Sequence, residues 1–202
     1  MSCALVTFSV MPSAEGERAV TPKPPSPGPC ATPPVVQNFN LHRYLGRWYE
    51  IERMFNPFQF GDCVTADYSL NPNNTVRVIN SNGLGGTLDT IKGTATPAPG
   101  HEGRLNVVFP DTRGFADANR GEGPNYNVVA TDYTNYAVVY SCTTFTIPGQ
   151  AETKLEFSWF LARRPMASPQ FVPRLKAYLD SVGVDSERYL PTNQDNCVRR
   201  PL

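Results

Sequence analysis

The side chains of this chain that are best suited to covalent or metal chemistry are its five cysteines. They are widely spaced, and no two of them form a Cys-x-x-Cys pair. They are Cys3, Cys30, Cys63, Cys142 and Cys197. Zinc sites need clustered thiolates or imidazoles, so this spacing argues against a metal site. It favours disulfide bonds formed in an oxidising compartment, and the sequence alone leaves their pairing open.

The sequence shows no recognisable arrangement of a catalytic acid, base and nucleophile. Both histidines, His42 and His101, fall in expected turns, and no Ser/His/Asp set is apparent. Nucleophilic and acid–base catalysis need such groups within hydrogen-bond reach of one another. We therefore expect a protein that is not an enzyme and that carries no metal or other cofactor.

Composition excludes two further classes of function. The 18 basic and 18 acidic residues of this 202-residue chain cancel, so no overall field would attract nucleic acid. No window approaches the roughly 18 consecutive apolar residues of a membrane-spanning helix. The remaining composition, with 11% aromatic residues and 20 prolines, is typical of a β-rich globular domain joined to a proline-rich segment.

The N-terminal region differs in composition from the rest of the chain. Residues 1–14 contain a short apolar run followed by small residues, which predicts a secretory signal peptide, although no Lys or Arg precedes the run. A disordered N-terminus or a misassigned start is the alternative. Cleavage would remove Cys3 and leave an even number of cysteines. Residues 15–34 are rich in proline and predict a flexible segment, so the globular domain is expected over 35–202.

Apolar and polar residues alternate with a period of two from Gly46 onward, which predicts a series of β-strands. In residues 126–133, for example, Tyr126, Val128 and Ala130 share one face. Short turns separate many of these segments, which favours hairpin connections. Eight strands are expected, over residues 46–54, 63–70, 75–80, 86–96, 104–109, 126–133, 136–145 and 154–163.

One amphipathic helix is expected after the last strand. In residues 168–183 apolar side chains recur at helical spacing, with Ser168 suited to the N-cap and Pro169 to the first helical position. Gly183 stands where a helix would end. A single helix of this kind has one apolar face to bury, so we expect it to pack on the outside of the sheet.

Eight antiparallel strands in succession leave two raw edges unless the sheet closes on itself or splits into a sandwich. The short connections favour an all-β fold, an eight-stranded antiparallel up-and-down barrel. Alternation alone does not distinguish a solid core from an interior that holds a ligand. The side chains expected to face the interior are Ala66, Tyr68, Val78, Asn80, Leu105, Val107, Phe109, Tyr126, Val128, Phe157, Trp159 and Leu161.

Three short motifs resemble the signature regions of the lipocalins in both order and spacing. They are "LGRWYEI" at 45–51, "TDY" at 131–133 and "ARRP" at 162–165, and the resemblance is strongest to the apolipoprotein D-like branch. The motif residues that we expect to be structural are Gly46, Trp48, Thr131, Asp132, Tyr133 and Arg163. The resemblance covers residues 30–197 and implies a barrel that is closed at one end.

The resemblance also assigns structural roles. It implies that Arg163 lies across the ring of Trp48 at the closed end, an arrangement worth about 0.5–2 kcal/mol. It further implies disulfide bonds Cys30–Cys142 and Cys63–Cys197. Neither assignment follows from spacing alone.

For function, the resemblance implies a secreted carrier of one small hydrophobic molecule: a steroid, a fatty acid, a retinoid or carotenoid, or a bilin. Residues matching Tyr68, Asn80, Phe109, Tyr126 and Trp159 line the ligand pocket in apolipoprotein D-like proteins. The alternatives are a bilin- or carotenoid-binding pigment protein, a lipocalin-type isomerase and an intracellular fatty-acid-binding protein.

Two loops and one turn carry further expectations. Loop 54–62 is unusually apolar, so it should either fold over the mouth of the barrel as a lid or contact a membrane, a lipoprotein or a protein partner. It is expected to expose the apolar side chains of Met54, Phe55, Phe58 and Phe60, around Pro57. The loop within 109–127 departs from the family pattern. Asn73 begins an Asn-Asn-Thr sequon on an expected turn, which predicts N-glycosylation in a secreted protein.

Overall fold

The computed structural model describes residues 26–56, 59–84, 86–100, 102–110, 123–146, 148–149, 151–166, 170–199 and 201. Within this part of the chain, ten strands form one sheet. They are β1 (Ser26–Pro27), β2 (Gly46–Met54), β3 (Asp62–Leu70), β4 (Val76–Leu84), β5 (Thr87–Pro97), β6 (Arg104–Val108), β7 (Tyr126–Thr131), β8 (Tyr136–Phe145), β9 (Thr153–Ala162) and β10 (Tyr189–Pro191). The helical elements are α1 (Leu41–Tyr44), α3 (Phe171–Ser181) and the 3₁₀ turn η1 (Ser186–Arg188).

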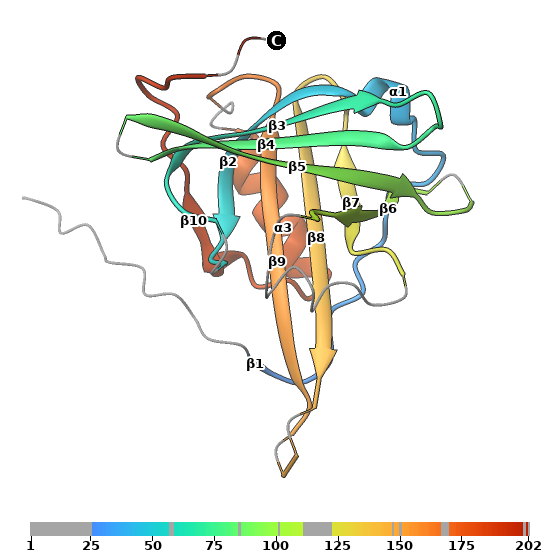
Figure 1. Ribbon diagram of the computed structural model, residues 1–202. Helices are drawn as coiled ribbons and strands as arrows, with labels where there is room; N and C mark the ends of the chain where they lie inside the picture. The colour runs from blue at the N-terminus through green and yellow to red at the C-terminus, as the bar shows by residue number, and fades with distance from the viewer. Residues whose placement is uncertain are drawn as a thin grey trace, which may run out of the picture.

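Strands β2 to β9 pair antiparallel in chain order, and β9 also pairs with β2. This last pairing closes the sheet, so the expected eight-stranded up-and-down barrel is confirmed (Figure 1). Closure removes the two unpaired edge strands that an open meander would expose. The two remaining strands are short additions: β1 pairs with the start of β9, and β10 pairs with the end of β2.

Register shifts interrupt the strand pairings β2–β9, β3–β4 and β7–β8, and two of these irregularities bear on which side chains face the interior. One lies in β7 between Val128 and Ala130, and the other in β2 between Glu50 and Glu52. After the first bulge, Ala130 packs with the outer cluster, so the expectation that it shares a face with Val128 is wrong. An extra residue in one strand reverses the alternation beyond it, because side chains follow a period of exactly two residues along a regular strand.

Helix α3 packs against the outside of the barrel, as expected. Its buried side chains, Leu175 and Leu179, join an outer apolar cluster with Met54, Val129, Val138, Tyr140, Phe160, Val184 and Tyr189. The helix begins at Phe171, with Gln170 at the N-cap position. Ser168 and Pro169 lie outside the described residues, and the first helical residue comes two positions later than the sequence indicates.

The C-terminal segment fills a gap in the barrel wall. Strands β2 and β3 pair only between Gly46 and Tyr49 on one side and Thr65 and Tyr68 on the other. Beyond that point residues 189–194 lie between them. The side-chain amide of Gln194 donates to the carbonyls of Glu50 and Val64, at 2.8 and 2.9 Å, and so links the two strands.

Both disulfide bonds that the resemblance implied are present. Cys30 is bonded to Cys142 on β8, with 5.8 Å between the Cα atoms, and Cys63 to Cys197, with 5.4 Å. The first attaches residues 26–34, which the sequence assigns to the proline-rich segment, to the barrel. The second anchors the C-terminal segment beside β3. Residues 1–25, which include Cys3 and the expected signal peptide, lie outside the described residues.

Candidate functional site

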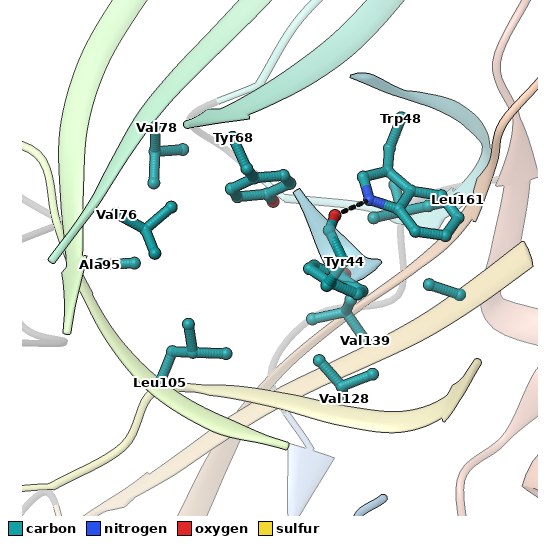
Figure 2. Close-up of a cluster of buried hydrophobic side chains, with 11 residues drawn as sticks. Tyr44, Trp48, Tyr68, Val76, Val78, Ala95, Leu105, Val128, Val139 and Leu161 are labelled. Atoms are coloured by element: carbon teal, nitrogen blue, oxygen red, sulfur yellow. Dashed lines mark hydrogen bonds between the residues drawn. The ribbon is translucent and has the colours of Figure 1, made fainter. Parts of the chain in front are cut away.

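The closed end of the barrel is built around Trp48, which has no exposed surface. The Arg163 guanidinium lies 3.7 Å from the centroid of the Trp48 rings, and the indole N–H donates to the Tyr44 carbonyl at 2.8 Å (Figure 2). The guanidinium also donates at 2.8–3.2 Å to the backbone carbonyls of Arg43, Tyr44, Arg47 and Tyr133. One side chain thus ties α1, β2 and the β7–β8 turn together beneath the indole.

Gly46 explains why a glycine precedes this tryptophan by two residues. Its φ of +92° lies in the region that favours glycine, and a Cβ added there would lie 3.4 Å from Nη1 of Arg163. Any other residue would therefore have a strained backbone here, with its Cβ in van der Waals contact with the guanidinium. The Gly-x-Trp motif is a requirement of the closed end.

The motif residues 131–133 form the turn beside this closed end. The Asp132 carboxylate accepts from the backbone N–H groups of Thr134, Asn135 and Tyr136. Burial alone would raise the pKa of Asp132, but the hydrogen bonds from these groups and from the Asn135 amide outweigh it and hold that pKa below its usual value. Asp132 is therefore an ionised turn anchor.

Tyr133 and Thr131 complete the turn. The hydroxyl of Tyr133 accepts from the backbone N–H of Asn40 at 3.1 Å, and the Arg43 guanidinium lies 4.5 Å from its ring centroid. Thr131 donates through its hydroxyl to the Tyr136 carbonyl at 2.7 Å. The "TDY" motif thus holds the β7–β8 turn against α1.

The residues expected to face the interior gather in one cluster inside the barrel. Ten of the twelve belong to it: Ala66, Tyr68, Val78, Leu105, Val107, Phe109, Tyr126, Val128, Trp159 and Leu161. The other two follow from register. Asn80 pairs directly with Ala66, and Phe157 lies two residues before Trp159 with their ring centroids 6.3 Å apart. All twelve side chains therefore lie on the inner face.

Exposure changes along the interior. Near the closed end Trp48, Val128, Ala137 and Val139 have no exposed surface. In contrast, Phe109, Tyr126 and Trp159, together with Asn80, point inward but keep part of their surface accessible. An inward-facing side chain stays accessible only where the interior is not completely filled. The inner face is therefore fully buried around Trp48 and partly accessible at Asn80, Phe109, Tyr126 and Trp159.

Three tyrosines meet inside the barrel. The hydroxyl oxygen of Tyr126 lies 2.8 Å from that of Tyr44 and 2.9 Å from that of Tyr68. Figure 2 shows the rings of Tyr44 and Tyr68 on the inner side of the cluster, facing Val76, Val78 and Leu105. Burial raises the pKa of Tyr68 to about 12 and raises that of the other two tyrosines well above the usual value. All three hydroxyls are therefore neutral and protonated at physiological pH.

A second polar group lies toward the open end and was not foreseen from the sequence. Gln59 accepts from the indole N–H of Trp159 at 3.1 Å and donates to the carboxylate of Glu50. That carboxylate also accepts from Arg53 and from the hydroxyl of Thr192. The bulge in β2 brings Arg53 into register with Trp159, so Glu50 and Arg53 both lie on the inner side of the strand.

Loop 54–62 differs in part from its expected exposure. Met54 is buried in the outer cluster beneath α3, with 1% of its surface exposed, so its expected exposure is wrong. The bulge in β2 turns this last residue of the strand outward. Phe55 and Phe60 are 40% and 59% exposed, which agrees with an apolar loop surface. Pro57 and Phe58 lie outside the described residues.

Among the described residues, no group of histidine, cysteine, aspartate and glutamate side chains is arranged to hold a metal ion. His42 is exposed on α1, and His101 lies outside the described part of the chain. The four described cysteines are in disulfide bonds. Within the same part of the chain, no helix is both long and apolar enough to cross a membrane.

A closed β-barrel with one sealed end, an accessible aromatic interior and an external helix defines the class of small-molecule-binding barrels. The sequence over residues 39–194 matches the lipocalin-like domain family. The chain therefore belongs to the lipocalin family.

Individual relatives agree with this assignment. The chain is 40% identical to apolipoprotein D of Mus musculus over 172 residues, covering 84% of this chain and 85% of that protein. It is 32% identical to the Lazarillo protein of Schistocerca americana, covering 96% and 83%. The structure of insecticyanin from Manduca sexta superposes with a TM-score of 0.68 at 21% identity, covering 85% and 89%, and shows the same fold.

Proposed function

We propose that this protein is a secreted carrier that reversibly binds one small hydrophobic molecule inside its barrel. One observation carries the proposal. Inward-facing aromatic side chains, including Phe109, Tyr126 and Trp159, remain partly accessible inside a barrel that is closed at one end. Such side chains offer a ligand a large apolar contact area with few polar groups. Candidate ligands are a steroid, a fatty acid, a retinoid or carotenoid, or a bilin.

The affinity to be expected follows from the area that such a ligand would bury. Removing about 300 Å² of apolar surface from water gains roughly 7 kcal/mol at about 25 cal/mol per Å². Loss of ligand freedom on binding reduces this gain, so dissociation constants in the micromolar range are expected. Membership of the lipocalin family, and similarity to a protein named as an apolipoprotein, support a carrier of this kind.

The proposed ligand contacts are the twelve inner-face residues. Among them, Asn80 and Trp159 carry polar atoms in addition to the surface that they offer to the ligand. The Oδ1 atom of Asn80 is buried and has no hydrogen-bond partner among the described residues. A buried amide oxygen without a partner is costly, so a donor group on the ligand would lower its free energy. Trp159 supplies an aromatic face whose N–H is already held by Gln59.

The described segment of the loop after β2 is proposed to act as a lid. Gln59 reaches from this loop to Trp159 and Glu50, which ties the loop to the inner wall. The exposed rings of Phe55 and Phe60 remain available to a lipoprotein, a membrane or a protein partner. No catalytic role and no nucleic-acid partner are proposed. A thiol titration of the denatured mature protein should give no free cysteine, whereas one reactive thiol would support the isomerase alternative.

Secretion and glycosylation of Asn73 are proposed together. Asn73 lies exposed on the turn between β3 and β4, and its side-chain oxygen accepts from the hydroxyl of Thr75 at 2.7 Å. Disulfide bonds favour an oxidising compartment, where this sequon is accessible to glycosylation. Expression in a eukaryotic secretory system should yield protein in the medium whose mass falls on treatment with an N-glycosidase. An unchanged mass would contradict the modification.

The decisive experiment for the carrier function is native mass spectrometry of the protein purified from its source. A single bound small molecule per chain is expected, and the released molecule identifies the ligand. A visible absorption band on the purified protein would favour the pigment alternative. Replacing Trp159→Leu should weaken binding of that molecule while the melting temperature changes little. A protein that co-purifies with nothing and binds none of the candidate ligand classes would contradict the proposal.

A further inference from the structure

The three tyrosine hydroxyls inside the barrel cannot satisfy one another completely. Each hydroxyl of Tyr44, Tyr68 and Tyr126 carries one proton, and the three oxygens are linked by two short contacts. Two contacts use two of the three protons, whichever oxygen donates in each. Within the described part of the chain these hydroxyls have no other hydrogen-bond partner. One O–H therefore remains free to donate.

The free donor is held at the inner surface of the barrel. Tyr44 and Tyr68 are 1% and 8% exposed, and Tyr126 is partly buried among the residues that line the interior. The neighbouring wall is apolar, made of Val76, Val78, Ala95 and Leu105 (Figure 2). A buried hydroxyl proton without an acceptor is unfavourable, so a ligand that brings an acceptor oxygen to this position gains a hydrogen bond.

We propose that the tyrosine group of Tyr44, Tyr68 and Tyr126 selects ligands that carry a neutral carbonyl oxygen at the end that enters the barrel first. This inference rests on the carrier function proposed above and specifies the ligand class for that site. The class comprises apolar molecules that end in a ketone, aldehyde or ester. A hydrocarbon end would leave the free O–H without a partner.

A carboxylate fits the same position less well. Burial raises the pKa of all three tyrosines, which shows that negative charge is disfavoured where their hydroxyls meet. The nearby cation that could offset a carboxylate is Arg163, but its N–H groups already donate to four backbone carbonyls and its face lies on the Trp48 rings. A neutral acceptor avoids the cost of burying an ion.

Three steroid probes that differ at one position test the inference: 5α-androstan-3-one, 5α-androstane and 5α-androstane-3-carboxylic acid. Their dissociation constants are measured by equilibrium dialysis at pH 7 for the wild type and for the variant Tyr44→Phe/Tyr68→Phe/Tyr126→Phe. Removing all three hydroxyls leaves no polar group unpaired and keeps the shape of each ring, so this variant should fold. The variant Tyr136→Phe, altered on the outer face, is the matched control.

The quantity to compare is the dissociation constant of the hydrocarbon divided by that of the ketone. Comparing this ratio between the wild type and each variant cancels the different hydration of the two probes. This ratio should fall by about three- to tenfold in the triple variant and stay unchanged in the control. The acid should bind the wild type at least about tenfold more weakly than the ketone. In the wild type the infrared carbonyl band of bound androstanone should lie at lower wavenumber than in an alkane solvent.

Equal ratios in the wild type and the triple variant would overturn the inference while leaving the carrier function intact. If the triple variant fails to fold, the position of the infrared band in the wild type decides the same point, since an unshifted band means that no hydroxyl donates to the carbonyl. If neither these probes nor the wider set of candidate ligands bind the wild type, both the carrier function and the inference are wrong.

Discussion

The indole N–H of Trp159 on β9 donates to the side-chain oxygen of Gln59, in the loop after β2, across 3.1 Å and 100 positions of the sequence. Through its amide nitrogen the same glutamine donates to Glu50, which is 2% exposed. A loop residue is thus the shared partner of an aromatic ring inside the barrel and of a buried carboxylate. This relationship couples the mouth of the barrel to its inner wall.

Replacing Gln59→Ala should loosen the loop over the mouth. Both Trp159 and Glu50 lose a hydrogen-bond partner, so the loop is held to the inner wall by fewer contacts. We expect ligand dissociation to become about three- to tenfold faster, measured by stopped-flow displacement. The Trp159 emission should also move to longer wavelength.

The matched control for this variant is Gln37→Ala, which removes a glutamine from an exposed turn outside the loop, where its amide donates to the Val35 carbonyl. It should leave both the dissociation rate and the emission unchanged. Equal dissociation rates for Gln59→Ala and the wild type would show that the loop does not restrict ligand exit.

Replacing Arg163→Lys should destabilise the closed end. Lysine keeps the charge but cannot lie flat on the Trp48 rings while donating to several carbonyls in different directions. We expect the free energy of unfolding to fall by about 2–3 kcal/mol, and the melting temperature by about 5–10 °C, with little change in ligand affinity. Arg164 is exposed and lies next to Arg163, so Arg164→Lys is the control and should unfold with the same free energy as the wild type. A large loss of affinity at unchanged stability would contradict the structural role of Arg163.

Stability should depend on the ionisation of Asp132. Its pKa is lower in the folded protein than in the unfolded chain, so its contribution is fully present above the unfolded value of about 3.9 and is lost as pH falls through the folded value. The variant Asp132→Asn should be less stable than wild type by about 1 kcal/mol at pH 7. This difference should shrink below about pH 4, as measured by urea unfolding at several pH values. A difference that is constant between pH 7 and pH 2.5 would contradict the assignment.

Removing the Cys63–Cys197 bond should release the C-terminal segment from the barrel wall. For Cys63→Ser/Cys197→Ser we expect a loss of about 3–5 kcal/mol, because the bond closes a long loop. Hydrogen exchange at the amide of Thr192, which donates to the Ile51 carbonyl, should become faster than global unfolding requires. The variant Cys30→Ser/Cys142→Ser removes the other disulfide bond, which closes a loop of similar length. It should leave the amide of Thr192 protected relative to global unfolding. Similar protection of Thr192 in both variants would show that the bond does not hold the segment in place.

The features that follow a regular period could be predicted from the sequence, including the eight strands of the barrel and the inward direction of all twelve interior residues. Such predictions succeed because alternation in a strand with one apolar face fixes its register. The bulges in β2 and β7 could not be predicted, because an extra residue leaves no mark in a short alternating segment. Ala130 and Met54 were misplaced for this reason, and the inward direction of Arg53 was missed.

Contacts between distant segments were also beyond the sequence alone. Gln59 stands in a loop with no periodic pattern, and nothing local indicates that it meets Trp159. The meeting of Tyr44, Tyr68 and Tyr126 likewise depends on strand tilt and on the placement of α1, which no spacing rule gives. The two disulfide pairings came from the family resemblance, since four cysteines do not determine their own partners.

The place of residues 189–194 between β2 and β3 has a consequence for biosynthesis. The ribosome synthesises β2 and β3 first. Gln194, which joins them, follows only after more than a hundred further residues. During translation the gap between β2 and β3 therefore stays open until residues 189–194 have been synthesised. The Cys63–Cys197 bond, which anchors the same segment, can therefore form only after both flanking strands have been synthesised.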